Sequence, residues 1–138
     1  MRKRSLSREL ALQILYQIDI THDPVNTVWD NFWSFNEETG ADEQIKLFSR
    51  ELVEGVAQHL EEIDAKIASY AANWELERMA VVDRNVLRMG SFELLYRQDI
   101  PPKVSINEAV ELAKKFSGLA SGKFVNGILD KIKQETKK

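Results

Sequence analysis

Hydrophobic residues recur at helical spacing along most of the chain, beginning close to the N-terminus. Between Ser5 or Ser7 and about Ile20, the apolar positions are Leu6, Leu10, Ala11, Ile14, Leu15 and Ile18. This three- and four-residue spacing forms one helix face, which Leu12 and Tyr16 widen further. A helix with so wide an apolar face packs against neighbours on several sides. We therefore expect a central first helix, with a serine as its N-cap.

The middle of the chain predicts amphipathic helices. Asp23 and Pro24 are typical of a helix start, an N-cap followed by a proline in the first turn. The apolar positions that follow are Val25, Val28, Trp29, Phe32 and Trp33. Aromatic residues at this spacing are far more often core than ligand-binding. A longer pattern over residues 45–67 indicates one helix or two with a break near His59, and we expect Trp74 to pack at the junction of the two halves.

Three more helices are predicted after residue 80. Asp83 is a candidate N-cap for the first of them, which should end before Pro101-Pro102. Ser105-Ile106-Asn107-Glu108 has the spacing of a capping box, and the helix that follows has Phe116 on its inner face. Ser121 can cap the last helix, after a short glycine-containing loop. No segment shows the sustained alternation of a strand, so the expected fold class is all-α with about seven helices.

Length and composition indicate one globular domain over residues 1–138. A chain of 138 residues with 43% hydrophobic residues can bury one substantial core. It has neither an apolar run of membrane-spanning length nor the pattern of a signal peptide, so we expect a cytoplasmic protein. There is no cysteine, and His22 and His59 have no nearby ligand partners. We therefore expect no metal, no cofactor and no disulfide.

The charge distribution indicates a local rather than a general anion-binding surface. The net charge is −3, with a pI near 5.5, which argues against coating nucleic acid through bulk positive charge. Basic residues nevertheless crowd the N-terminus, at Arg2, Lys3, Arg4 and Arg8. Cations at the start of a helix are disfavoured by the helix dipole, and a bound phosphate would relieve that conflict. The alternative is a solvated basic tail.

The segment Lys123–Asp130 combines a core pattern with a polar edge. The face expected to be buried contains Val125, Ile128 and Leu129, and Ile132 continues it in the next turn. Phe124 lies at the margin of that face, on the flank of Lys123, Gly127 and Lys131. An aromatic ring beside cations suits stacking on a base while phosphates are neutralised. The alternative is that Phe124 is a core residue and the lysines are a solvated face.

No catalytic constellation is evident. Residues 117–123 contain glycine, serine and lysine but lack the spacing and the preceding strand of a phosphate-binding loop. There is no nucleophile elbow, and neither histidine has a complementary serine or carboxylate motif. These observations favour a binding protein over an enzyme.

Four segments together resemble the NusB family of bacterial transcription factors. They are Arg8–Gln17, Val82–Arg88, Ile106–Lys114 and Lys123–Asp130, in this order and spacing. The resemblance covers essentially the whole chain. It implies seven or so helices in two packed subdomains, with the first helix central, and a non-enzymatic role. It also implies pairing with NusE, a small-subunit ribosomal protein, and binding of the boxA element in nascent RNA during antitermination and ribosomal RNA synthesis.

Functional residues follow from the same resemblance. The RNA contacts it implies are Arg2, Lys3, Arg4, Arg8, Tyr70, Lys123 and Phe124, and the positions facing NusE are Tyr16 and Asp83. Other antitermination factors and the RNA polymerase complex are implied as further partners. The free protein could form a homodimer that hides the NusE surface. A modest basic patch on an acidic protein predicts weak binding of RNA by this chain alone.

Two other functions fit parts of the pattern. One is the RNA-recognition module of a ribosomal RNA cytosine methyltransferase, which has a similar fold, although the sequence shows no glycine-rich segment for the methyl donor. The other is a helical protein–protein adaptor without an RNA role, in which the basic N-terminus is only solvated.

Overall fold

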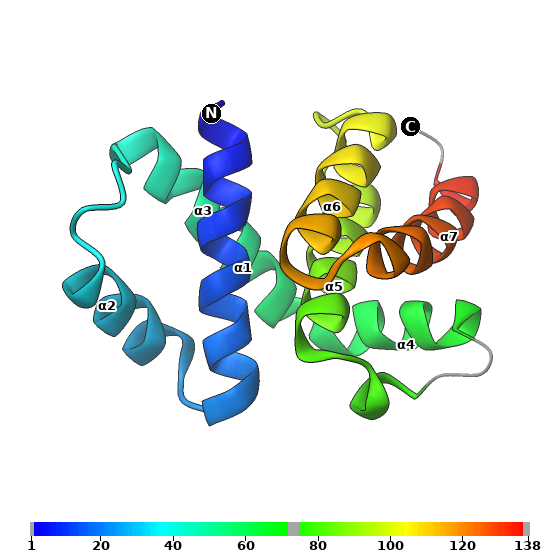
Figure 1. The fold of residues 1–138 in the computed structure, drawn as a ribbon, viewed down its shortest axis with the longest axis horizontal. Coiled ribbons are helices and arrows are strands. Elements are labelled where there is room, and N and C mark those ends of the chain that lie inside the picture. The colour runs from blue at the N-terminus through cyan, green and yellow to red at the C-terminus, as the bar shows by residue number, and fades with distance from the viewer. Residues whose placement is uncertain (1, 72–74, 137–138) are drawn as a thin grey trace.

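The computed structural model describes residues 2–71 and 75–136, which contain seven α-helices, one short 3₁₀ helix and no strand (Figure 1). The helices are α1 (Lys3–Thr21), α2 (Val25–Phe35), α3 (Glu43–Gln58), α4 (Leu60–Tyr70), η1 (Leu76–Arg78), α5 (Val81–Tyr96), α6 (Pro102–Ser117) and α7 (Leu119–Glu135). The predicted all-α class is confirmed, and so is the break at His59, which separates α3 from α4. Trp74 lies outside the described residues.

The first helix is central, as predicted. In Figure 1 it stands between α2 on one side and α5 and α6 on the other, and α3 crosses behind it. Every residue from Ser7 to Leu12 is buried, which explains the wide apolar face of this segment. Helices α1–α3 form one subdomain and α4–α7 the other, and both α1 and α3 contact α5 across the boundary. Within the described residues, no helix is long and apolar enough to cross a membrane.

One hydrophobic core runs through both subdomains. It takes side chains from all seven α-helices, including Ile14 of α1, Phe32 of α2, Leu52 of α3, Ile63 of α4 and Leu129 of α7. At Gly55 the backbone of α3 comes so close to Phe92 of α5 that an added Cβ would overlap the phenyl ring. This contact requires glycine, because the ring is itself buried and stacked on Tyr96.

The start of α1 differs from the prediction of a serine N-cap. The helix begins at Lys3, and Arg2 occupies the N-cap position without a side-chain hydrogen bond. Ser7 lies one turn inside the helix and is buried. Its hydroxyl lies 3.0 Å from the carbonyl oxygen of Lys3 and 2.9 Å from that of Ile45 in α3. The serine therefore satisfies a tertiary contact instead of a helix end.

The predicted caps at Asp23 and Asp83 are also wrong. Helix α2 begins one residue later than expected, with Pro24 in the N-cap position. Helix α5 begins at Val81 with Ala80 as N-cap, so Asp83 lies within the first turn. An aspartate at that position still interacts favourably with the helix dipole, which accounts for the signal in the sequence.

The capping box and the serine cap in the C-terminal half are wrong for a similar reason. Pro102 already starts α6, because proline fits the first helical turn, so Ser105 and Glu108 lie inside the helix. Ser121 lies inside α7, which starts at Leu119. Gly118, with φ +102°, is the single residue between the two helices, and its positive φ is the conformation that glycine tolerates.

Candidate nucleic-acid interface

The basic residues at the N-terminus are ordered on the first turn of α1. Arg2, Lys3 and Arg4 are all exposed. The Nζ atom of Lys3 lies 2.7 Å from Oδ2 of Asp42 and donates to Oε1 of Gln44 at 2.9 Å. The hydrogen bond from Lys3 lowers the pKa of Asp42, which itself caps α3. Lys3 is therefore held against the start of α3.

Arg4 is positioned by an aromatic ring rather than by a close ion pair. Its guanidinium carbon lies 4.4 Å from the centroid of Phe48, a cation–π distance. Its nearest carboxylate, Asp99, is 3.9 Å away and accepts two hydrogen bonds from Arg97 at 2.9 Å. Those bonds lower the pKa of Asp99 to about 2. Arg4 is thus an exposed, oriented guanidinium with a weakly engaged counter-ion, which suits a phosphate contact.

Arg8 does not join this exposed cluster. It donates to both carboxylate oxygens of Glu93 in α5, at 2.8 and 2.9 Å, and its side chain is 3% exposed. A contact between Arg8 and RNA phosphates stays a prediction, but in this structure the side chain is buried rather than exposed. The physical reason is its place on α1, at the spacing of Ala11, Leu12 and Leu15, all of which are buried.

A polar network around Arg8 connects α1 to α5 and α6. Ser105 donates to Oε1 of Glu93 at 2.8 Å, and Ser5 donates to Oε1 of Glu108 at 2.6 Å. A nitrogen of the Arg8 guanidinium also lies 3.6 Å from Oε1 of Glu108. These contacts fix the first two turns of α1 against the C-terminal subdomain. Arg8 therefore acts as a positioning residue for the basic N-terminus.

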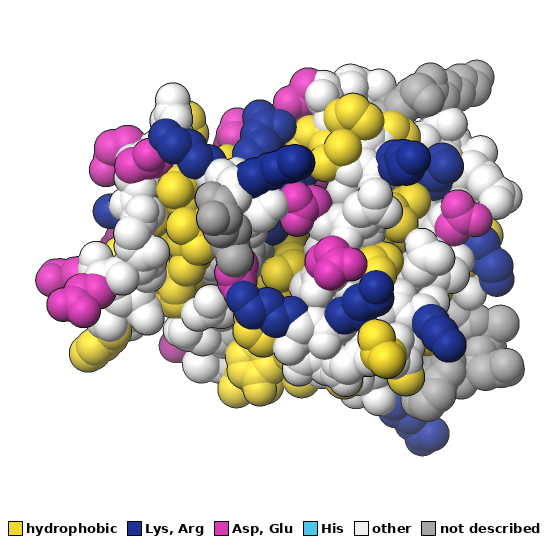
Figure 2. Space-filling view, turned by 45° about the horizontal axis from the view of Figure 1, so that its top comes forward, with side chains coloured by type: hydrophobic (Ala, Val, Ile, Leu, Met, Phe, Trp, Pro, Cys, Tyr) yellow, Lys and Arg dark blue, Asp and Glu magenta, His cyan; other side chains and the backbone are white. Residues whose placement is uncertain are grey.

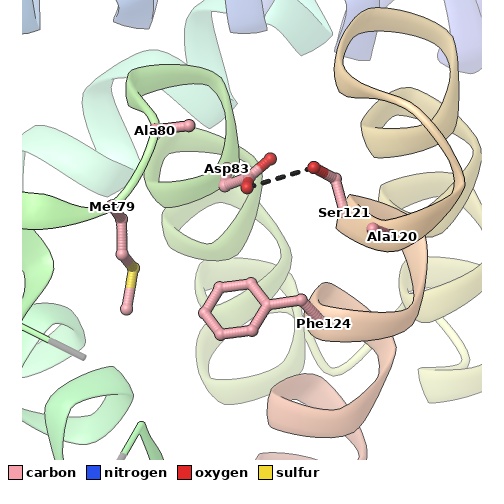
Figure 3. Close-up of a pocket in the computed structure, with 6 residues that line it drawn as sticks. All are labelled: Met79, Ala80, Asp83, Ala120, Ser121 and Phe124. Atoms are coloured by element: carbon pink, nitrogen blue, oxygen red, sulfur yellow. Dashed lines mark hydrogen bonds between the residues drawn. The ribbon is translucent and has the colours of Figure 1, made fainter. Parts of the chain in front are cut away.

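Phe124 lines a cavity of about 380 Å³ between the starts of α5 and α7 (Figure 3). The lining residues are Met79, Ala80, Asp83, Ala120, Ser121 and Phe124, which we call the Phe124 pocket. Ser121 donates to Oδ2 of Asp83 at 3.2 Å, while Oδ1 of Asp83 is buried without a hydrogen-bond partner among the described residues. Phe124 and Asp83, assigned by resemblance to different partners, thus line one pocket.

Lys123 precedes Phe124 on α7 and is exposed, but it lines a separate depression between α6 and α7 and not the Phe124 pocket. Gly127 is also exposed, and an added Cβ there would meet nothing within 4 Å. On the side of the molecule that is uppermost in Figure 1, Lys and Arg side chains alternate with Asp and Glu side chains (Figure 2). The surface is therefore locally basic rather than uniformly so, as the composition predicts.

Tyr70 lies at the end of α4 and contacts the end of α7. Its hydroxyl donates to Oε2 of Glu135, and Lys66 donates to Oε1 of the same carboxylate at 2.7 Å. The hydrogen bond to Glu135 raises the pKa of Tyr70. Tyr70 is not among the residues that line the Phe124 pocket. A contact between Tyr70 and RNA would compete with Glu135 for the phenol.

Tyr16 and Asp83 lie on the two neighbouring helices α1 and α5. Tyr16 is 40% exposed, and Asp83 is half-buried in the Phe124 pocket. The helices are joined close to both residues, because Asp19 accepts hydrogen bonds from Arg84 at 2.6 and 2.9 Å.

Phe116 was expected on the inner face of α6. It is 43% exposed and contributes apolar surface instead.

The cluster around Asp19 was not predicted from the sequence. Asp19 also accepts from Asn85 at 2.8 Å and from Arg88 at 3.2 Å, and Arg88 donates to Asp64 in α4. Burial alone would raise the pKa of Asp19, but the hydrogen bonds from Arg84 and Asn85 and the positive charge of Arg88 lower it overall. The only sequence signal was a charged residue inside an otherwise apolar helix face.

The chain is similar to known proteins over nearly its whole length. The NusB family model matches residues 5–134. A Myxococcus xanthus protein named transcription antitermination protein NusB is 50% identical over 133 residues, which cover 96% of this chain and 95% of that protein. The structure of T. maritima NusB superposes with a TM-score of 0.86 at 35% identity, over 99% of this chain and 93% of that one.

A second solved structure includes other molecules. It is a crystal structure of the antitermination factors NusB and NusE in complex with dsRNA. One of its chains superposes on this one with a TM-score of 0.87 at 29% identity, over 97% of this chain and 98% of that chain.

Proposed function

This chain belongs to the NusB family, and from that premise we propose that it is an RNA-binding transcription antitermination protein that acts together with NusE. Its RNA target is a boxA-type single-stranded element in nascent transcripts, and its role supports ribosomal RNA synthesis. The function is recognition and not catalysis, because the relatives are antitermination factors rather than enzymes.

The Phe124 pocket is the observation that most supports this proposal. It places an aromatic side chain in an open cavity on α7, and the exposed Lys123 precedes it in the sequence. A base can stack on such a ring while the lysine neutralises its phosphate, a combination typical of single-strand recognition. Asp83 in the same pocket brings the proposed NusE-facing surface into contact with the RNA-facing one.

Phosphate contacts come from a small set of cations. They are Arg2, Lys3 and Arg4 on α1 and Lys123 on α7, while Arg8 holds the N-terminal turns in place. On a protein of net charge −3, so few phosphate contacts give weak and salt-sensitive binding. NusE therefore extends the binding surface, with Tyr16 and Asp83 on the side of this chain that faces it. Tyr70 contacts RNA once its hydroxyl leaves Glu135.

The wider assembly follows from the same role. We place the protein in the cytoplasm, where transcription takes place, with other antitermination factors and the RNA polymerase complex as further partners. In the absence of NusE, the exposed Tyr16 surface is free to form a homodimer. The M. xanthus relative is matched over 95% of its own length and is itself an antitermination protein, which disfavours the methyltransferase module.

An RNA titration with and without NusE tests the proposal. We expect Phe124→Ala to weaken binding of a boxA-type single-stranded RNA about 5- to 150-fold, the range of one lost stacking contact. Lys123→Ala, at an exposed position, should weaken binding with no effect on folding. Phe35→Ala is the matched control, because Phe35 is an 86% exposed aromatic residue on α2.

Two outcomes of this titration would contradict the proposal. If Phe124→Ala and Arg4→Ala both leave the affinity unchanged in folded protein, the assigned RNA surface is wrong. If no RNA is retained at any salt concentration while NusE still binds, the chain is a protein adaptor without an RNA role.

A further inference from the structure

A second depression lies on the other flank of α7 from the Phe124 pocket. It encloses about 780 Å³ between α6 and α7. Its lining residues are Asn107, Val110, Glu111, Lys114, Leu119, Gly122, Lys123 and Asn126, which we call the α6–α7 groove. Consecutive residues of an α-helix project about 100° apart, so Lys123 in the groove and Phe124 in its pocket lie on adjacent flanks of α7. A chain that passes Phe124 can cross α7 and enter the groove.

The groove carries the chemistry that a single strand of RNA needs. Lys114 and Lys123 supply two cations, and Asn107 and Asn126 supply side-chain amides. An amide can donate and accept at once, so it can read the edge of a base. Neither amide has a hydrogen-bond partner among the described residues. Val110 and Leu119 add apolar surface, and Leu119 is 73% exposed.

Lys114 is fixed in the groove by the glycine opposite it. A Cβ added at Gly122 would lie 2.8 Å from Cγ of Lys114, so the lysine stem packs directly on the backbone of α7. Its ammonium group reaches Glu111 only at 3.5 Å. Glu111 is the one acidic residue of the groove lining and its side chain is 71% exposed. The described lining therefore has two cations and one anion, which favours an anionic occupant.

We propose that the α6–α7 groove binds the nucleotides that flank those at Phe124, with Lys114 on a phosphate and Asn107 and Asn126 on base edges. This inference rests on the proposed RNA-binding function and extends its site by one helix width. A helix with side chains is roughly 10–12 Å across, so about three to four nucleotides at a stacked spacing of ~3.4 Å span the crossing. A protein segment is disfavoured as occupant because two amides and two lysines match phosphates and bases.

RNA length separates the groove from the Phe124 pocket. The complex with NusE is titrated with the shortest boxA-type RNA that still depends on Phe124, and with the same RNA extended by about four nucleotides at its 5′ or its 3′ end. We expect one extension to raise the affinity of the unmodified protein. Asn107→Ala and Asn126→Ala should each remove about 3- to 10-fold of that gain, the range of one lost hydrogen bond, and leave the short RNA unaffected.

Charge changes in the groove give independent readouts. Lys114→Ala should reduce the slope of log affinity against log salt by about 0.7 for the extended RNA, the value for one phosphate contact on a single strand. Glu111→Gln should raise the affinity for the extended RNA without changing that for the short one, a gain that misfolding cannot produce. Lys103→Ala on α6 and Asn31→Ala on α2 are matched controls outside the groove.

Three results would overturn the inference. Neither extension raises the affinity for RNA, or the groove variants weaken binding of the short RNA as much as that of the long one. The third is that the groove variants change NusE binding in the absence of RNA, which would make the groove a protein contact. If Phe124→Ala weakens the short RNA but the groove variants do nothing to the long one, the groove assignment alone fails. If Phe124→Ala has no effect on the short RNA, the proposed function itself fails.

Discussion

At the scale of single residues, the position of an arginine on α1 decides what its charge does. Arg4 lies over Phe48 at the surface, whereas Arg8, one turn later, is enclosed with Glu93, the two side chains being 3% and 2% exposed. A buried ion pair offsets its desolvation only when hydrogen bonds satisfy the remaining atoms. Two bonds from Arg8 and one from Ser105 do so here.

Arg8→Ala should therefore destabilise the fold far more than Arg4→Ala. Removing one partner of a buried pair leaves an uncompensated charge and costs about 3–5 kcal/mol, whereas losing an exposed contact costs about 0–1 kcal/mol. Urea unfolding of the two variants measures both. The double variant Arg8→Met with Glu93→Gln removes both charges and should recover most of the loss. An Arg8→Ala protein of normal stability but weakened RNA affinity would show that Arg8 faces the RNA.

The exposure of Lys123 and Arg4 could be predicted from the sequence, but the role of Arg8 could not. Its spacing with Ala11, Leu12 and Leu15 places it on the buried face, yet its charge argued for the surface. What reconciles the two is Glu93, a residue 85 positions away. Periodicity identifies a face of a helix but not the partner that makes a buried charge tolerable there.

At the scale of elements, close helix approaches depend on individual glycines. Gly55 of α3 lies against the ring of Phe92 in α5, and three ring atoms would fall within 2.7 Å of an added Cβ. Gly127 of α7 is the opposite case, because an added Cβ would meet open space. Both residues lie inside helices, so the intrinsic preference for alanine is the same at the two sites.

We expect Gly55→Ala to destabilise the protein and Gly127→Ala to stabilise it. At both sites alanine gains up to about 1 kcal/mol in helix propensity. At Gly55 the gain is outweighed by overpacking against a rigid buried ring, which costs about 1–3 kcal/mol or more. Thermal unfolding of the pair checks the sign of each change. A stabilised Gly55→Ala variant would mean that α3 and α5 separate easily.

Helix number and most of the buried faces were predictable from periodicity, with Phe116 of α6 as an exception, whereas helix starts were not. Five expected caps or capping boxes lie elsewhere than at N-caps: the serine at the start of α1, Asp23, Asp83, Ser105 and Ser121. Ser105 and Ser121 instead donate to carboxylates of α5. A hydroxyl that satisfies a tertiary acceptor looks the same in sequence as one that caps a helix, because both signals are a serine near a helix start.

At the scale of the whole molecule, the functional surfaces arise where helices from distant parts of the chain meet. The Phe124 pocket combines the start of α5 with the start of α7, and the α6–α7 groove needs both of its helices in register. Such cavities have no periodic signature. Both lie within the C-terminal subdomain. The basic start of α1 is fixed to that subdomain by separate contacts, through Arg8 at one end of the helix and Asp19 at the other.

The ion pairs of Asp19 with Arg84 and Arg88 make the stability of the whole molecule sensitive to acid. Because the pKa of Asp19 is lowered on folding, its contribution is complete above the unfolded value of 3.8 and is lost as the pH falls below it. Asp99, with a pKa of about 2, acts in the same direction. The free energy of unfolding should therefore decline as the pH drops from about 5 towards 2.

Asp19→Asn isolates the part of this decline that belongs to the junction between subdomains. The variant should be less stable than the unmodified protein near neutral pH, because Arg84 and Arg88 lose their shared carboxylate. The two stability curves should converge at acid pH, since a protonated Asp19 resembles asparagine. Asp130→Asn, at an exposed position on α7, is the matched control and should shift the curve little. A stability difference that stays constant from neutral to acid pH would mean that the Asp19 charge does not hold the subdomains together.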